Sequence, residues 1–145
     1  MPAAQEKRKG ENVSPRELKV IFGDKYKIDV DYKGFTVKTD QPVRDGGDGT
    51  VPAPFDYFLV SLAACAGFYA LAFCRERKIP VEGLAMTMTA EKGEVSKLID
   101  KVTIAVVLPN GFPEKYRFAV VKAIDHCTVK ANILRAPQFE IVTRP

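Results

Sequence analysis

Hydrophobic and polar side chains alternate through residues 18–39, and this alternation predicts β-strands. Apolar and charged residues take turns over residues 26–31, and a similar pattern runs over residues 35–38. Lys33-Gly34 lies between the two runs and is typical of a tight hairpin turn. The first part of the chain is therefore expected to form strands joined by a hairpin.

A glycine-rich break follows these strands. After Gln41-Pro42, the chain has three glycines within four residues, at Gly46, Gly47 and Gly49. Such a segment predicts a mobile loop that other groups can approach closely. It is not a phosphate-binding loop, because it lacks the Gly-Lys-Ser/Thr ending and a buried strand before it.

The central part of the chain predicts one long helix near residues 54–78. Pro54 in the first turn and Asp56 just after it suit a helix start, and Pro80 stops the helix. Residues 57–74 carry no charge and reach the length of a transmembrane helix. Five of them are alanine, so we favour a helix buried on all sides within the protein over a membrane span. Its small residues permit close approach of a second helix, from the same or a second subunit.

The second half of the chain predicts two strands, two helices and a final strand, again from periodicity and helix-start signals. The resulting order is ββ-α-ββ-α(α)-β, with no internal repeat. The predicted elements are a strand over 84–90, a strand over 102–108, a helix opened by Pro113-Glu114, a short helix at 131–134 and a last strand between Phe139 and Val142.

Composition and charge narrow the class of protein. A chain of 145 residues with 46% hydrophobic and 28% charged side chains is typical of a soluble globular domain. Half of the +4 net charge lies in residues 1–19, so the body lacks the basic stripe of a nucleic-acid-binding protein. The first 13 residues hold no apolar core of a signal peptide. We expect a flexible polar leader over residues 1–17, a single domain over residues 18–145, and a cytoplasmic protein that binds neither nucleic acid nor membrane.

The cysteines are candidates for chemistry. Cys65 and Cys74 are nine residues apart on the predicted helix, about 13 Å along it and on opposite sides, so they neither pair nor share a metal. With one histidine in the chain, a zinc site is disfavoured. Cys127 follows His126, but neighbours on a helix do not face each other, which argues against a cysteine–histidine pair. From spacing alone, a small buried hydrophobe is the favoured interpretation of Cys65 and of Cys74, and Cys127 can be a core residue at a helix end.

Two stretches resemble the OsmC/Ohr family. Residues 54–65, P-F-D-Y-F-L-V-S-L-A-A-C, resemble its helix start "P-x-E-L-L-x-x-x-L-x-x-C". Residues 123–129, A-I-D-H-C-T-V, are similar to its second cysteine motif "A-x-x-x-C-P-V". The similarity runs from about Leu18 to Thr143. It implies an α+β, OsmC-like fold with strands wrapped around long central helices in an intertwined homodimer.

The resemblance also implies a thiol-dependent peroxidase that reduces organic hydroperoxides in oxidative-stress defence. Cys65 would be the peroxidatic cysteine and Cys127 the resolving one, and an external dithiol would be the reductant, with no metal or organic cofactor. A pocket lined by residues such as Phe58, Phe68 and Tyr69 would favour organic peroxides.

The family's activating groups are only partly matched. The resemblance implies an arginine that lowers the thiol pKa, for which Arg44 is the best candidate, with Arg16 behind it. Asp56 stands where the family has a glutamate, either as a catalytic residue or as a helix-start residue. Thr128 replaces the usual proline. The alternative is a protein of the same fold that binds small molecules or handles sulfur without peroxide turnover.

Overall fold

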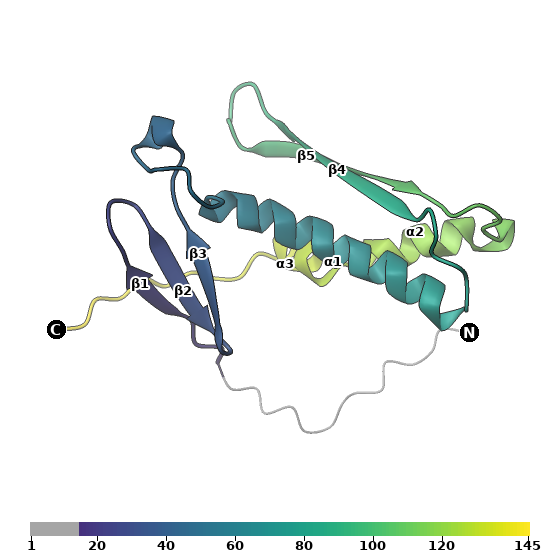
Figure 1. Ribbon diagram of the computed structural model, residues 1–145, viewed down its shortest axis with the longest axis horizontal. Coiled ribbons are helices and arrows are strands. Elements are labelled where there is room, and N and C mark those ends of the chain that lie inside the picture. The colour runs from purple at the N-terminus through teal and green to yellow at the C-terminus, as the bar shows by residue number, and fades with distance from the viewer. Residues whose placement is uncertain (1–14) are drawn as a thin grey trace. The chain divides into compact units, whose positions relative to one another are not determined.

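The computed structural model describes residues 15–145 (Figure 1), and these divide into two compact units, one that ends at Pro54 and one over Phe55–Pro145. Of the predicted leader, residues 1–14 lie outside the described residues. The prediction of a single domain over residues 18–145 stays a prediction.

The first unit contains a three-stranded antiparallel sheet in the order β1-β2-β3. β1 covers Lys19–Phe22, β2 Ile28–Tyr32 and β3 Phe35–Thr39. The predicted hairpin turn is confirmed: Lys33 and Gly34 both have positive φ, 50° and 80°, as a two-residue turn between twisted strands requires. Besides the two strands that the hairpin joins, β2 and β3, this part of the chain forms a third strand, β1.

The sheet of the first unit buries no apolar side chain. Val30 of β2 pairs with Val20 of β1 and with Val37 of β3, so the three valines form a row across the sheet. Val20 and Val37 are nevertheless exposed. Polar bonding, rather than an apolar core, organises this unit.

The glycine loop is held together by a buried carboxylate, whereas the sequence predicts a mobile loop. Asp40 is fully buried and accepts hydrogen bonds from the N–H groups of Gln41, Asp48 and Thr50 and from the Thr50 hydroxyl, at 2.8 to 3.2 Å. A side chain at Gly47 would come within 1.9 Å of the Gln41 carbonyl oxygen, so only glycine fits there. The loop is therefore defined by these bonds and by the backbone freedom of glycine.

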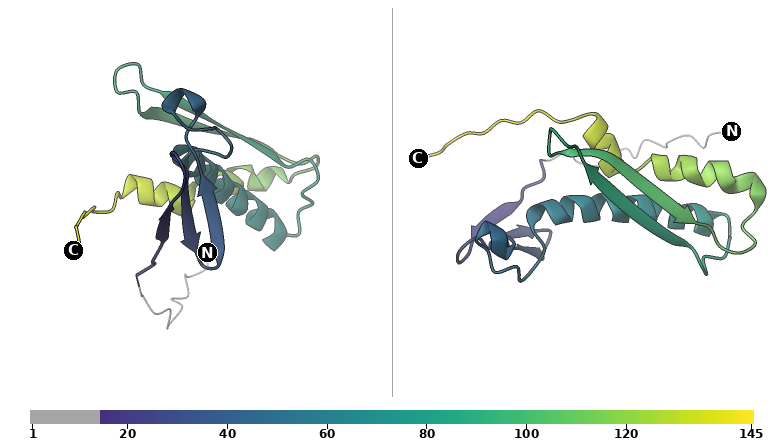
Figure 2. Two further views of the ribbon diagram at one scale, coloured as in Figure 1. Left: turned by 60° about the vertical axis from the view of Figure 1, so that its left-hand side comes forward. Right: turned by 90° about the horizontal axis from the view of Figure 1, so that it is seen from above.

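The second unit is built on α1, which covers Pro54–Glu76 and confirms the predicted long helix. The hairpin of β4 (Ala85–Lys92) and β5 (Ile99–Val107) runs alongside α1 (Figures 1 and 2). Two short helices follow, α2 over Arg117–Asp125 and α3 over Thr128–Leu134. The predicted elements over residues 84–108 and 113–134 are thus present.

The apolar core of the second unit lies between α1, α2 and the inner face of the hairpin. From α1 it takes small residues, such as Ala66 and Ala70, together with Phe73. Val120 of α2 is fully buried, and Met86 of β4 packs against the cluster from the hairpin. The alanines let the neighbouring elements approach α1 closely, as the sequence suggests.

The opposite face of α1 is exposed in one chain, which differs from the predicted burial on all sides. Its exposed apolar side chains include Val60 and Phe68. By length and composition α1 could also cross a membrane, with 28% of the relevant window buried. One chain by itself therefore covers only one side of this helix.

The predicted last strand is wrong. Residues 135–145 form no regular structure, so the strand around Phe139 is absent from this chain, and Ile141 is 96% exposed. Nearby, α2 ends at Asp125 and Cys127 lies in the turn before α3. That turn changes what the cysteine can contact.

Candidate functional site

The structure brings two of the four predicted site residues together. Cys65 lies midway along α1 and is partly exposed, whereas Cys127 is buried. The Cys127 thiol hydrogen-bonds the Cys65 sulfur. Both cysteines are free thiols. Residues that are far apart in the sequence thus form one dithiol site.

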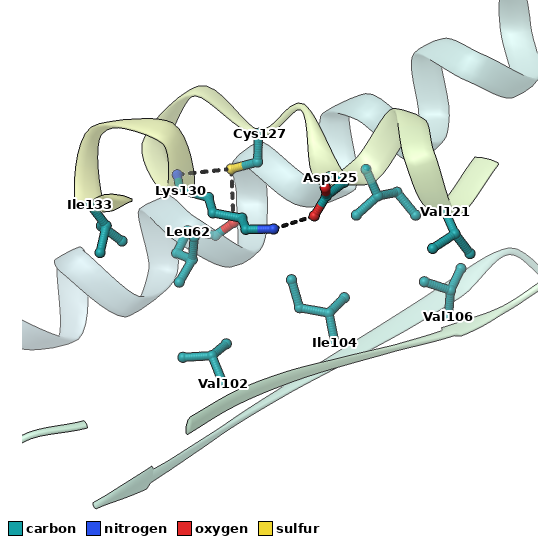
Figure 3. A pocket seen from close by; sticks show the side chains of 10 residues that line it. Leu62, Val102, Ile104, Val106, Val121, Asp125, Cys127, Lys130 and Ile133 are labelled. Carbon is teal, nitrogen blue, oxygen red and sulfur yellow. Dashed lines mark hydrogen bonds and ion pairs between the residues drawn. The ribbon is translucent and has the colours of Figure 1, made fainter. Parts of the chain in front are cut away.

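The turn between α2 and α3 places Cys127 beside α1. Cys127 is the N-cap residue of α3, and its Sγ accepts a hydrogen bond from the Lys130 N–H at 3.5 Å (Figure 3). The same Sγ lies 4.0 Å from the carbonyl oxygen of Leu62, which precedes Cys65 by one turn of α1. Capping therefore orients the Cys127 sulfur towards the part of α1 that carries Cys65.

Hydrogen bonds around Cys65 favour its thiolate. Burial by itself would raise the pKa of Cys65, but bonds from the Val129 N–H, the Cys127 thiol and the Thr128 N–H hold that pKa below its ordinary value. Each of these groups donates a hydrogen to the sulfur, and such bonds are stronger to the charged form. The start of α3 therefore supplies backbone donors that residue-type motifs do not reveal.

Cys127 is shifted in the opposite direction. Burial raises the pKa of Cys127, and the hydrogen bond to Cys65 and the charge of its thiolate raise it further, against the N–H groups of Lys130 and Val129. The pair is therefore asymmetric, because the pKa of Cys65 is lowered and that of Cys127 is raised.

An apolar cavity of about 380 Å³ adjoins Cys127. It lies between the helices and the β4–β5 hairpin, and Figure 3 shows aliphatic side chains pointing into it from both sides. An ion pair between Lys130 and Asp125 lies at its edge. The residues that line the cavity are Leu62, Val102, Ile104, Val106, Val121, Ile124, Asp125, Cys127, Lys130 and Ile133.

The aromatic pocket expected from the sequence does not form this cavity. None of Phe58, Phe68 and Tyr69 lines it, and the two phenylalanines are exposed. Tyr69 lines a separate open groove between α1 and α2. The wall of the cavity opposite the helices is aliphatic because β5 turns alternate side chains, Val102, Ile104 and Val106, towards it, which the sequence shows only as an alternating pattern.

The other two predicted site residues lie away from the dithiol in the sequence. Arg44 belongs to the short helix Val43–Asp45 of the glycine loop, where its exposed guanidinium lies 3.5 Å from the Asp45 carboxylate. Asp56 lies in the first turn of α1 and precedes Cys65 by nine positions along the helix. Their roles stay predictions.

The remaining candidates have structural positions. Cys74 is fully buried in the core, and burial raises its pKa, although the charge of Arg77 lowers it slightly. His126 is the C-cap residue of α2. Within residues 15–145, no group of three or more histidine, cysteine, aspartate or glutamate side chains could hold a metal ion.

Comparison with known proteins agrees with the fold. The family model for OsmC-like proteins matches residues 47–142. An OsmC-like protein from Mycoplasma pneumoniae is 14% identical, with a TM-score of 0.65 over 86% of this chain and 89% of that one. A hypothetical protein from Aquifex aeolicus is 16% identical, with a TM-score of 0.65 over 85% and 89%.

An organic hydroperoxide resistance protein, OsmC, from Legionella pneumophila is also similar. It is 18% identical, with a TM-score of 0.54 over 87% of this chain and 93% of that chain. At these identities the similarity establishes a mixed α+β fold. Comparison with the curated proteins gives no match.

Proposed function

Because this chain belongs to the OsmC-like protein family, we propose that it is a thiol-dependent peroxidase that reduces organic hydroperoxides with Cys65 and Cys127. The observation that carries the proposal is the asymmetric dithiol. Cys65 is partly exposed and its pKa is lowered by three hydrogen-bond donors, one of which is the Cys127 thiol. A peroxidatic cysteine needs a thiolate that peroxide can reach, and a resolving cysteine must lie close to it.

The first step consumes the peroxide. The Cys65 thiolate attacks the terminal peroxide oxygen, and the O–O bond breaks. The alkoxide leaves and takes up a proton to become an alcohol. Cys65 is thereby oxidised to a sulfenic acid while the hydroperoxide is reduced.

The second step resolves the sulfenic acid. The Cys127 sulfur attacks the Cys65 sulfur, the S–O bond breaks, and water leaves as a disulfide forms. An external dithiol then attacks the disulfide through a mixed disulfide and leaves in its oxidised form, which restores both cysteines. Rapid resolution protects Cys65 from irreversible over-oxidation. We propose no metal or organic cofactor for this cycle.

The aliphatic cavity beside Cys127 supports an organic rather than an inorganic peroxide. Its walls are mainly valine, leucine and isoleucine side chains, which favour a hydrocarbon group over water. A hydroperoxide with an alkyl body can bury that body there, whereas hydrogen peroxide has nothing to bury. The ion pair between Lys130 and Asp125 supplies polar groups at the edge of this cavity.

Arg44 remains the proposed source of positive charge near the thiolate, and Asp56 is proposed to act with it or to serve the start of α1. The rigid loop around Asp40 supports a defined position for Arg44, since the bonds to this carboxylate link both ends of the loop. Arg44→Ala should then slow peroxide reduction without changing the free energy of unfolding by more than about 0.5 kcal/mol.

We also propose that the protein acts as a cytoplasmic homodimer. Apolar side chains that one chain leaves exposed support a second chain that covers them. Size-exclusion chromatography with light scattering tests this, and a stable monomer would count against it. The exposed apolar side chains include Phe22, Phe35, Phe68, Phe118, Phe139 and Ile141.

The central experiment follows the thiols. The reduced protein is treated with a modest excess of an organic hydroperoxide, and intact mass and free thiols are measured. Wild type should form an internal disulfide, and Cys127→Ser should accumulate a sulfenic acid at Cys65. Cys65→Ser should be inert, and peroxide consumption should fall by more than about a thousandfold.

Cys74→Ser is the matched control, because Cys74 lies on the same helix but in the apolar core. It should form the same disulfide as wild type. If Cys65 remains a free thiol in wild type, the peroxidase proposal fails. The alternative of a binding or sulfur-handling protein without peroxide turnover would then be preferred.

A further inference from the structure

A tyrosine on α1 contacts the residue that begins α3. Tyr69 follows Cys65 by four residues, so both side chains project from the same face of the helix. The Tyr69 hydroxyl lies 3.0 Å from Thr128 Oγ1, within hydrogen-bond distance. Thr128 is the first residue of α3. The bond therefore joins the start of α3 to α1 one turn beyond Cys65.

The same threonine also reaches Cys65 through its backbone. The N–H groups of Thr128 and Val129 hydrogen-bond the Cys65 sulfur. Thr128 thus contacts α1 twice, with its hydroxyl at Tyr69 and with its N–H at Cys65. Two contacts one helical turn apart define both the position and the tilt of the start of α3 against α1.

Apolar packing contributes little to holding α3 in this position. The helix has seven residues and none of them is buried. The chain after Leu134 has no regular structure. Polar contacts at the start of α3 therefore carry a large share of its attachment, and the Tyr69 bond is one of them.

We propose that Tyr69 is a positioning residue for Cys65, whose hydroxyl, bonded to Thr128, holds the backbone donors of α3 against the cysteine sulfur. The proposal deepens the proposed function and rests on the same dithiol. Loss of the hydroxyl would let the start of α3 move away from α1, so that the donors reach the sulfur less often. The Cys65 thiolate would then be less favoured.

The test uses variants that remove only this bond. Tyr69→Phe removes the phenol hydroxyl, and Thr128→Val replaces the threonine hydroxyl while keeping its N–H. Thr128→Ser keeps both groups. The readout is the pH dependence of alkylation of Cys65 by iodoacetamide, followed by mass spectrometry of the Cys65 peptide. This readout needs no peroxide turnover.

Tyr69→Phe and Thr128→Val should each raise the apparent pKa of Cys65 and slow its alkylation at neutral pH about threefold. The double variant should be no slower than either single variant, because both changes remove the same bond. Thr128→Ser should behave like wild type. The titratable side chains nearest this turn, Cys127, His126 and the Asp125–Lys130 pair, are unchanged in all of these variants.

Tyr116→Phe is the matched control, since this tyrosine packs against Phe73 at the core of the second unit. It should leave the Cys65 titration unchanged. A wild-type titration in Tyr69→Phe, or additive effects in the double variant, would overturn the proposal. A shifted titration in Tyr69→Phe together with absent peroxide turnover in wild type would support the positioning role and reject the peroxidase.

Discussion

Cys65 and Cys74 lie on the same helix, nine residues apart, yet their surroundings are opposite. Cys65 is partly exposed and receives three hydrogen bonds that lower its pKa. Cys74 is fully buried in the apolar core, and burial raises its pKa. The helix thus carries one thiol prepared for reaction and one used for packing. What separates them is the element that packs beside each, which is the start of α3 for Cys65 and the core for Cys74.

The largest expected difference is in reactivity towards an alkylating reagent. In the native protein at neutral pH, Cys65 should react with iodoacetamide on the order of a thousandfold faster than Cys74, because Cys74 reacts only when the core opens. Mass spectrometry of the two peptides over time measures both rates. In urea-unfolded protein the rates should converge, and comparable native rates would break the contrast.

The next largest difference is in stability. Cys74→Ser places a hydroxyl in the apolar core and should lower the free energy of unfolding by about 1–3 kcal/mol. Cys65→Ser, at a partly exposed position, should change it by less than about 1 kcal/mol. Urea denaturation of both variants gives the comparison, with Cys74→Ala separating loss of packing from burial of a hydroxyl. Equal losses in the free energy of unfolding would show that the two positions are equally buried.

A smaller effect is expected at Arg77, which lies beside the packed end of α1. Its guanidinium stacks 3.9 Å from the centre of the Phe73 ring, and its Nη1 donates to the Phe73 carbonyl oxygen at 3.4 Å. Arg77→Met keeps the aliphatic stem and should cost about 0.5–1 kcal/mol in the free energy of unfolding. Alkylation of Cys65 should not change. Slower alkylation would mean that the two ends of the helix are coupled.

The smallest effect concerns how stability varies with pH. The lowered pKa of Cys65 contributes stability that is present above the unfolded thiol pKa, about 8.5, and is lost as pH falls through the folded pKa. The raised pKa of Cys74 works in the opposite sense, because its contribution is present below the unfolded pKa and is lost as pH rises through the folded pKa.

Urea denaturation between neutral and alkaline pH separates these two contributions. Relative to wild type, Cys65→Ser should remove a rise in stability with pH and Cys74→Ser should remove a fall. Changes of the same sign in both variants would contradict the assigned directions. In the double variant of Cys65→Ser and Cys74→Ser, the two changes in the pH dependence of stability should add if the sites are independent.

Much of the fold was predictable because its signals are local. Alternation gave the hairpins, and the proline at residue 54 together with the uncharged run after it gave α1. The predicted final strand was wrong, since a strand forms only with a partner strand, and its apolar residues alone do not supply one. The burial of α1 was overestimated for a related reason. Apolar residues show that a helix face needs to be covered, but they do not show whether the same chain covers it.

The candidate site was likewise predictable only in part. The two cysteine motifs pointed to Cys65 and Cys127 and left Cys74 as a packing residue, which agrees with their placement in the structure. The aliphatic cavity, the backbone donors of Thr128 and Val129 and the bond from Tyr69 were missed. Every residue except proline has a backbone N–H, so the residue type does not mark which N–H groups contact a sulfur. Tyr69 did offer a signal, its spacing of four residues from Cys65.

By itself, the sequence determined the long helix, the hairpins on either side of it and the helices that follow, because periodicity and helix-end residues are properties of neighbouring positions. Only the tertiary structure decided which of the two candidate thiols has the lowered pKa. That choice depends on the turn between α2 and α3, where the Cys127 cap and two backbone donors meet α1. Burial and hydrogen bonding set a pKa through space, and the distance between positions 65 and 127 exists only once the chain has folded.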